Sequence, residues 1–361
     1  MQEPAPQHGH NRLDFIQALR GLAAFGVVLF HAKIVMPTAG QAALFEWGAA
    51  GVDLFFVVSG FIMVHATARS DGSLRYALEF LSKRLARIWP VYMIWMVLYI
   101  VTVERVPHVW SSLARSAVFY PSALRPPPMF GGTPNSVGWT INYEVWFYVL
   151  FAISLVAKRW RWLTFASLVA AFTIVIPLVL TGDVHTAAGQ EYRLPTAILR
   201  LAANPMTWDF AAGVAIGLIY RSRFHLRHDG VLKVFVILAV TVEVWCLGTG
   251  FRAGYGPAAW GTPIIVMVLA LALWDKQHPI AVPRWLIWLG DVSFSLYLLH
   301  RIPLLVGYFH LPSPLPGGFP YLFAVIVVSL LLAELSARYL ERGLSEWVRV
   351  RLVRGVHRLT A

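Results

Sequence analysis

Long apolar stretches separated by short polar or basic segments set the pattern of this chain. A helix needs about 20 mostly apolar residues to cross the hydrocarbon core of a bilayer. The stretches that meet or approach this length lie at 15–36, 51–68, 87–104, 137–157, 161–180, 205–220, 231–249, 262–275, 286–309 and 319–340. The pattern predicts an all-α integral membrane protein, a bundle of about ten transmembrane helices.

Composition supports the membrane assignment. Of the 361 residues, 58% are hydrophobic and 13% are charged, which is more apolar than a soluble domain of this length. A net charge of +12 would suggest nucleic acid in a soluble protein, but membrane topology explains it here, and no nucleic-acid partner is expected. The single cysteine, Cys246, excludes an intrachain disulfide framework and any Cys-based zinc site, and no metal is predicted.

Three regions are expected along the chain. Residues 1–14 are polar and lack the basic start, short apolar stretch and cleavage site of a signal peptide, so the first apolar run is expected to be retained. Residues 15–341 form the transmembrane domain, and 342–361 form a basic tail. The chain shows no fixed-period repeat and no soluble domain at either end.

Basic residues are distributed unevenly between the alternate connections. Cytoplasmic segments of membrane proteins carry the excess of Lys and Arg. With a cytoplasmic N-terminus, the outer connections hold few of the 30 basic residues, namely Lys33, Arg105, Arg115, Arg125, Arg193, Arg200, Arg252 and Arg301. This asymmetry predicts an even number of spans with both termini in the cytoplasm.

The longest outer connection runs from about residue 105 to 136 and contains Pro126–Pro128 and the pair Gly131 and Gly132. It is either an ordinary exposed loop or a lid or acceptor platform over a polar cavity.

Ionisable side chains inside the spans mark a candidate site, because such groups are costly in a membrane. Arg20 and His31 lie in the first span, eleven residues apart. Eleven residues make close to three helical turns, so both lie on one face, about 16 Å apart along the axis. Arg20 alone is explained equally well as an interfacial cation, and His31 alone is better explained as a hydrogen-bonded core histidine. Their shared face favours a site.

Two carboxylates lie at a depth similar to that of His31. Asp53 is near the outer end of the second span, where helix capping explains it equally well. Glu144 lies about two turns inside the fourth span, too deep for a cap. Three further acids within expected spans, Asp209, Glu243 and Glu334, have no assigned role.

A second group of basic residues precedes the third span. Arg84 and Arg87 share a helix face at the cytoplasmic side, although the charge asymmetry of membrane proteins by itself explains them better than a site does. His300, in the ninth span, falls in the outer half, where a structural and a catalytic role are equally plausible.

These motifs, in this order, resemble acyltransferase family 3, a family of membrane proteins. The resemblance covers the whole chain and rests on Arg20 with His31, on the segments 51–61, 84–90 and 139–144, and on the segment 293–300. The opening segment 15–24 further resembles the bacterial branch that modifies exopolysaccharides. Near the end, Glu341-Arg342-Gly343 replaces the family's usual Glu-x-Pro, which weakens any role for that end.

The resemblance implies a ten-helix bundle that transfers an acyl group, usually acetyl, from cytoplasmic acyl-coenzyme A to a sugar hydroxyl at or across the bacterial inner membrane. It implies His31 as the catalytic histidine and places Arg20, Arg84 and Arg87 near the acyl donor. Acyl-coenzyme A is then a co-substrate, and no permanently bound cofactor is expected. Some relatives carry an additional hydrolase-like domain, so this chain is expected to act alone or with a separate partner.

The residues suggest a mechanism independently. Arginine suits the phosphates of coenzyme A through charge and paired donors. Histidine suits proton abstraction near neutral pH, so His31 is predicted as general base, with Glu144 or Asp53 orienting its ring. An acyl-histidine relay is a variant. Acceptor binding is assigned to aromatic and imidazole groups, namely Trp139, Tyr143 and His300, although an interfacial aromatic belt explains Trp139 and Tyr143 equally well.

The expected partners are acyl-coenzyme A, membrane lipid, and a polysaccharide or lipid-linked oligosaccharide acceptor, with the polysaccharide synthesis machinery as a further candidate. A transporter or flippase of lipid-linked sugars is the rival class, because intramembrane acids and histidines also mark transport pathways. A non-enzymatic partner of a polysaccharide synthase is a third, but it leaves the alignment of Arg20 and His31 unexplained.

Overall fold

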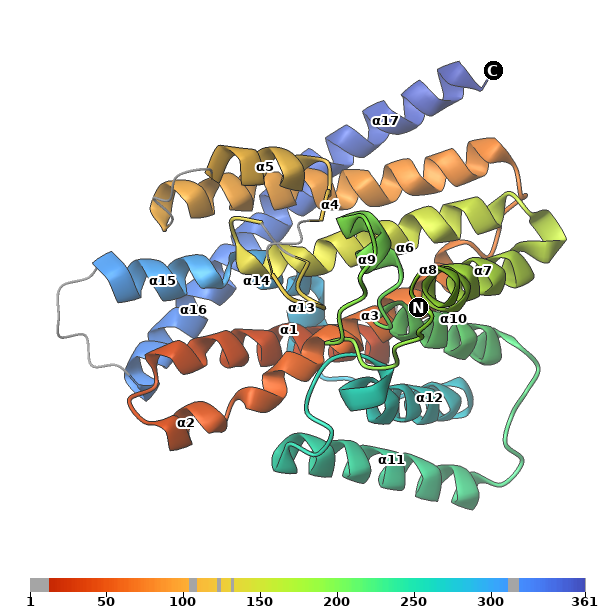
Figure 1. Cartoon of the computed structure of the whole chain (residues 1–361). Helices are drawn as coiled ribbons and strands as arrows, with labels where there is room; N and C mark the ends of the chain where they lie inside the picture. The colour runs from red at the N-terminus through yellow and green to blue at the C-terminus, as the bar shows by residue number, and fades with distance from the viewer. Residues whose placement is uncertain (1–12, 104–108, 122–124, 131–132, 311–317, 361) are drawn as a thin grey trace, which may run out of the picture.

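The computed structural model describes residues 13–103, 109–121, 125–130, 133–310 and 318–360 (Figure 1). Every regular element within these ranges is helical. In the part of the chain that the structure describes, seven helices are long and apolar enough to cross a membrane, or eight if the bent pair Arg284–Asp291 and Ser293–Phe309 counts as one span. The all-α, multi-pass prediction is therefore confirmed, while the number of ten spans and the position of the termini stay predictions.

The helices pack as one bundle. Their bounds are α1 Asp14–Ala32, α2 Ala39–Ala43, α3 Gly51–Ala66, α4 Leu74–Thr102, α5 Val109–Ala117, α6 Trp139–Leu155, α7 Arg161–Ala170, α8 Ile176–Thr181, α9 Ala197–Ala202, α10 Thr207–Arg221, α11 Asp229–Thr249, α12 Thr262–Gln277, α13 Arg284–Asp291, α14 Ser293–Leu299, α15 Arg301–His310, α16 Phe319–Ser336 and α17 Ser345–Leu359. Short 3-10 or π-helical turns, labelled η1 to η7, connect several of them, such as η2 (Glu46–Ala50) and η6 (Pro257–Gly261).

Apolar side chains cover much of the outer surface. On α11, which packs beside α12 at the edge of the bundle (Figure 1), Val231, Val244 and Trp245 are more than half exposed. Large exposed apolar surface is unfavourable in water but matches lipid tails. The exposed faces of α7 and α8 follow the same rule, with Leu163 and Val179 exposed. These faces fit a lipid environment.

Two of the expected spans are short helices. α6 has 17 residues and α10 has 15, so both are shorter than the about 20 residues that usually cross a bilayer. A third span differs at its start: α4 begins at Leu74 rather than near residue 87, because the Ser73 hydroxyl caps it by accepting from the Tyr76 amide at 3.0 Å. The basic residues Arg84 and Arg87 therefore lie inside the helix, not before it.

Glycines let the central helices approach closely. A Cβ on Gly60 would overlap the Phe210 carbonyl, and one on Gly213 would overlap that of Val57, so α3 and α10 are in backbone contact. A Cβ on Gly21 would stand 2.9 Å from the backbone nitrogen of Gly290, which brings α1 against α13. Glycine is the residue that permits such contact. These contacts fix α1 and α3, the two helices that carry Arg20, His31 and Asp53.

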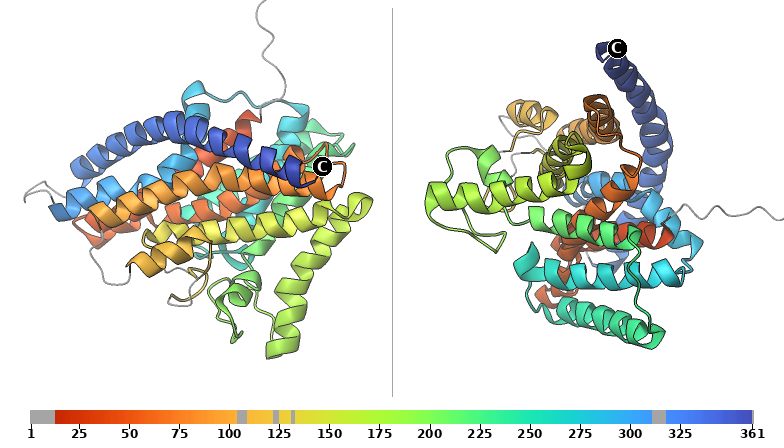
Figure 2. Two further views of the ribbon diagram at one scale, coloured as in Figure 1. Left: turned by 90° about the horizontal axis from the view of Figure 1, so that it is seen from above. Right: turned by 90° about the vertical axis from the view of Figure 1, so that its right-hand side faces the viewer.

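The C-terminal part of the chain contains one bent helical segment and one long continuous helix. The chain bends by 55° between α13 and α14. The helix from Phe319 to Leu359 is continuous, passing from α16 through the π-helical turn η7 (Ala337–Leu344) into α17. Figure 2 shows α17 running alongside α4, and His357 Nε2 lies 2.7 Å from Glu79 Oε1. The predicted basic tail is thus largely a helix packed on the bundle.

The described part of the long 105–136 connection packs on the bundle and is not an open loop. It contains α5, and its later residues are held by α6 and α14: the Tyr143 hydroxyl donates to the Pro128 carbonyl at 3.0 Å, and Asn135 Nδ2 donates to the Leu298 carbonyl at 2.8 Å. Phe130 is 2% exposed. Arg105, Gly131 and Gly132 lie outside the described residues.

Candidate active site

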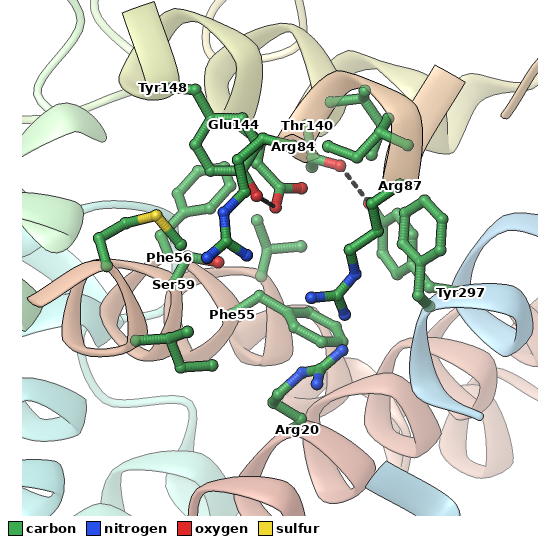
Figure 3. A pocket seen from close by; sticks show the side chains of 16 residues that line it. Arg20, Phe55, Phe56, Ser59, Arg84, Arg87, Thr140, Glu144, Tyr148 and Tyr297 are labelled. Carbon is green, nitrogen blue, oxygen red and sulfur yellow. Dashed lines mark hydrogen bonds between the residues drawn. The ribbon is translucent and has the colours of Figure 1, made fainter. Parts of the chain in front are cut away.

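A cavity inside the bundle brings together the three arginines that the sequence singled out. Arg20 comes from α1, while Arg84 and Arg87 come from one face of α4. Figure 3 shows the three guanidinium groups pointing into the same hollow. The sequence placed Arg84 and Arg87 on one face, and the structure adds Arg20 to it across the bundle.

Local sequence explains why α4 presents its arginines inward. Glu79 lies one turn before Lys83 and pairs with it at 3.1 Å, and it also pairs with Arg75 at 3.3 Å, so these cations are held at the helix surface. Arg84 lines the cavity, and its guanidinium carbon lies 5.6 Å from the centre of the Phe80 ring and 6.0 Å from that of Tyr148. Aromatic faces offer such a cation a favourable surface.

Glu144 supplies the negative charge of the cavity. Its carboxylate accepts a hydrogen bond from the Tyr148 hydroxyl one turn further along α6, and it lies close enough to Arg20 and Arg84 to attract both. A second acid, Glu341 in η7, accepts from the Ser295 hydroxyl at 2.5 Å and also attracts Arg20. The cavity therefore contains three positive charges that the nearby carboxylates neutralise only in part. The remaining positive charge suits an anionic ligand.

His31 lies beyond the cavity and pairs with the other predicted histidine. His31 Nδ1 is 3.2 Å from His300 Nε2 and 2.9 Å from the Val27 carbonyl oxygen, and the ring centres are 4.9 Å apart. His300 is 1% exposed, whereas His31 is only partly buried. No sequence pattern joins these two residues, which are separated by most of the chain.

Tyr297 separates the histidine pair from the arginine cavity. Its ring lies in the cavity wall beside Phe55, with ring centres 5.6 Å apart, and the centre of the His300 ring is 6.3 Å from that of Tyr297. The Tyr297 hydroxyl is 2.7 Å from the Thr140 hydroxyl, which fixes this wall against α6. The site thus has two neighbouring parts, an arginine cavity and a histidine pair.

Asp53 belongs to a different cluster. One of its carboxylate oxygens accepts from the Gly256 amide at 2.5 Å, and its carboxyl group interacts with the buried carboxyl group of Asp209 on α10. Glu243 on α11 is buried nearby. Within the described residues no hydrogen bond joins Asp53 or Glu144 to His31, so the geometry does not support the predicted orienting role of either carboxylate. His300 occupies the position that they were expected to take.

The two aromatic residues assigned to the acceptor are packed in the protein. Tyr143 is 0% exposed and Trp139 is 6% exposed. Their rings meet edge to face at 5.8 Å, and Trp139 also packs against Tyr255 at 5.6 Å. Neither ring presents a free face on which a sugar would stack, because each is covered by neighbouring side chains. His300 is likewise too buried to meet an acceptor.

Several cavity residues escaped the sequence analysis. Tyr148 was detectable, because it follows Glu144 by one helical turn on an otherwise apolar face. Phe55, Thr140 and Tyr297 lie in the segments 51–61, 139–144 and 293–300 that carry the family resemblance, but hydropathy alone does not separate them from core residues. Among the described residues no group of three or more His, Cys, Asp and Glu side chains is arranged to hold a metal ion.

Comparison with known proteins places this architecture in a family. The model of the acyltransferase domain family matches residues 13–335. The exopolysaccharide production protein ExoZ of Rhizobium meliloti (strain 1021) is 30% identical over 86% of this chain and 93% of its own length. Nodulation protein 10 of Rhizobium leguminosarum bv. viciae is 25% identical over 83% of this chain and 85% of its own.

A longer relative matches as well. The O-acetyltransferase OatA of Staphylococcus aureus (strain NCTC 8325 / PS 47) is 24% identical over 91% of this chain but only 56% of its own length. No solved structure matches the chain significantly. With a family match over nearly the whole helical bundle, the chain belongs to acyltransferase family 3 and is a multi-pass membrane acyltransferase.

Proposed function

We propose that this enzyme moves an acetyl group from cytoplasmic acetyl-coenzyme A to a sugar hydroxyl of a surface polysaccharide, an exopolysaccharide or its lipid-linked precursor, in the bacterial inner membrane. The observation that carries the donor assignment is the cavity into which Arg20, Arg84 and Arg87 all point. The relatives' names supply the acceptor class, because ExoZ is named for exopolysaccharide production and OatA for O-acetyl transfer.

The arginine cavity suits a polyanionic donor that carries a thin apolar arm. Guanidinium groups bind phosphate through charge and paired donors. Around them the walls are apolar, including Val52, Ile62 and Met63, which suits the arm that leads to the thioester. Arg84 also borders a second hollow, lined by Lys83 and by Arg349 of α17. Two basic hollows that share one arginine suit a ligand with phosphates at more than one point.

His31 is the proposed general base. It shares a face of α1 with Arg20, about 16 Å along the helix axis, and it is partly exposed, so an acceptor hydroxyl has access to it. The hydroxyl would lose its proton to His31 while its oxygen attacks the thioester carbon. As the carbon–sulfur bond breaks, the proton passes to the thiolate of coenzyme A. The thioester has to pass the wall formed by Phe55 and Tyr297 to reach this point.

The acceptor is expected to approach from the outer side of the bundle. His31 lies in the last turn of α1, before the turns η1 (Lys33–Val35) and η2, and Glu46 pairs there with Lys33 at 2.7 Å. The burial of Trp139 and Tyr143 favours a supporting role beneath this surface over direct sugar stacking.

The topology that accompanies this proposal has ten spans and cytoplasmic termini. The short helices α6 and α10 and the broken α13–α15 segment would count as spans, because each is packed within the bundle and need not meet lipid along its whole length. The Lys and Arg asymmetry then puts Arg84 and Arg87 on the cytoplasmic side, where acetyl-coenzyme A is made available.

Transfer by the purified protein tests the proposal. The protein in lipid vesicles is given acetyl-coenzyme A labelled in the acetyl group together with isolated surface polysaccharide, and mass spectrometry follows the sugar. His31→Ala is expected to abolish transfer. Arg84→Ala is expected to raise KM for acetyl-coenzyme A about tenfold or more, since a charge-assisted hydrogen bond contributes roughly 1.5–3 kcal/mol.

Arg75→Ala is the matched control, because Arg75 lies on the same helix but pairs with Glu79 at the surface. It is expected to leave KM unchanged. Full transfer by His31→Ala would remove the assigned base. Loss of polysaccharide export from cells with acetylation of the exported fraction intact would instead indicate a transporter of lipid-linked sugars.

A further inference from the structure

The two histidines of the pair make hydrogen bonds that fix which nitrogen of each ring carries a proton. His300 Nδ1 lies 3.1 Å from the Leu296 carbonyl oxygen, and His31 Nδ1 lies 2.9 Å from the Val27 carbonyl oxygen. A carbonyl oxygen only accepts, so each Nδ1 has to be the donor. The neutral form of each ring then carries its proton on Nδ1 and a lone pair on Nε2.

One arrangement satisfies the contact between the rings as well. His300 Nε2 carries a lone pair and faces His31 Nδ1 at 3.2 Å, so the Nδ1 hydrogen of His31 is shared between the Val27 carbonyl and His300. In the reverse arrangement, His300 Nε2 would carry a hydrogen and His31 Nδ1 would accept it. His31 Nδ1 would then have no hydrogen to donate to the Val27 carbonyl oxygen. Within the described residues His31 Nε2 has no hydrogen-bond partner, which leaves its lone pair available.

We propose that His300 is a positioning residue whose Nε2 accepts from His31 Nδ1, holding the His31 ring so that its Nε2 takes the proton of the acceptor hydroxyl. This inference rests on the proposed role of His31 as base. It replaces the acceptor-binding role that the sequence suggested for His300, and it assigns to a neutral imidazole the task that a carboxylate performs in hydrolase triads.

The charge that forms during transfer explains the choice of a second imidazole. When His31 Nε2 takes a proton, the ring becomes a cation that is hydrogen-bonded through Nδ1 to the lone pair of His300. The cations that face the pair are Arg301, which donates to the Ser136 hydroxyl, and Lys33, which pairs with Glu46. An acceptor lone pair on His300 offsets the unfavourable proximity of these two cations to a protonated His31.

Matched amide variants separate positioning from packing. Gln places an amide oxygen near the position of the histidine Nε2, whereas Asn reaches only the Nδ1 position, and Leu supplies neither group. His300→Gln is expected to keep kcat within a few-fold of the wild type. His300→Asn and His300→Leu are expected to lower kcat about 10–100-fold with KM for acetyl-coenzyme A unchanged, because only the transition state contains the charged His31.

Four kinetic outcomes decide the question. If His300→Gln keeps its kcat while His300→Asn and His300→Leu lose theirs, the proposal is supported. A Gln variant as slow as Leu, or full kcat in all three variants, overturns it. An active His31→Ala protein overturns the proposed base itself, whatever the His300 series shows, so the two failures are distinguishable.

A second measurement reads the protonation of both rings in the wild-type protein. Nitrogen-15 solid-state NMR of histidine-labelled protein in lipid vesicles reports which ring nitrogen is protonated. The two signals are assigned by their absence from His31→Ala and His300→Gln protein. Both rings are expected to show a protonated Nδ1 and a bare Nε2. A protonated Nε2 on either neutral ring would overturn the inference.

Discussion

Gly213 offers a direct test of the close contact between α3 and α10. In Gly213→Ala, the added Cβ would overlap the Val57 carbonyl oxygen and lie 2.8 Å from the carbonyl carbon. Carbon atoms pack best at about 3.5–4.0 Å, so the two helices have to separate by roughly 1 Å. Overpacking of this kind costs about 1–3 kcal/mol. Alanine also gains about 0.5–1 kcal/mol over glycine within a helix, which offsets part of the cost.

Gly248→Ala is the matched control. Gly248 lies in α11, is exposed, and would have no atom within 4 Å of an added Cβ. The Gly248→Ala variant therefore gains the helix stability of alanine without the destabilisation caused by overpacking. The difference between the two variants isolates the separation of α3 from α10, worth about 1–3 kcal/mol.

Thermal unfolding in detergent, at one fixed scan rate, measures this difference. At about 2–4 °C for each kcal/mol, Gly213→Ala is expected to melt about 2–12 °C below Gly248→Ala. It is also expected to bind acetyl-coenzyme A more weakly, because α3 carries Phe55, Phe56 and Ser59 into the arginine cavity. Equal melting temperatures for the two variants would refute the backbone contact between α3 and α10.

Three further predictions concern single hydrogen-bonding groups. Tyr148→Phe removes the hydroxyl that donates to Glu144. The loss of this hydrogen bond, worth about 0.5–1.5 kcal/mol, is expected to lower kcat/KM for acetyl-coenzyme A by a few-fold to tenfold. Unchanged kinetics would contradict this. Lys276→Met removes an ammonium group that donates to three backbone carbonyls at the end of α10 and is expected to lower stability by about 1–3 kcal/mol, measured by thermal unfolding. The Ser73 backbone amide lowers the pKa of Asp71 below its ordinary value of 3.8, so the stability that Asp71 contributes is present above pH 3.8 and is lost as the pH falls below it. Asp71→Asn is therefore expected to melt below the wild type at neutral pH, and the difference should vanish in acid.

The sequence predicted the membrane class and most of the helices, because repeated apolar runs of span length are rare in soluble proteins. It predicted less well where helices break or shorten. Hydropathy averaged over a long stretch of residues did not detect the bend before α14 or the early start of α4. The start of α4 depends on a local contact, the Ser73 cap. α6 and α10, with 17 and 15 residues, pack against α4 and α3, and hydropathy does not show where these helices end.

The candidate site was also predicted only in part from the sequence. Helical periodicity placed Arg20 with His31, and Arg84 with Arg87, since each pair lies on one helix. It had no means of finding the contact between His31 and His300, which depends on how α1 and α14 meet in space. The pairing of Asp53 with His31 met the same limit: α3 packs against α1, yet the Asp53 carboxylate accepts from the Gly256 amide, and equal depth in a bilayer does not show which way a side chain points.

The packing of α17 along α4 bears on where the working unit of this enzyme ends. The family match stops at residue 335, yet the helix that begins at Phe319 continues to Leu359 and contacts the arginine-bearing α4 through His357 and Glu79. A shortened protein cut at the family boundary would lose Glu341 and leave one side of α4 uncovered. The physical domain, judged by what supports the cavity, is longer than the domain defined by shared sequence.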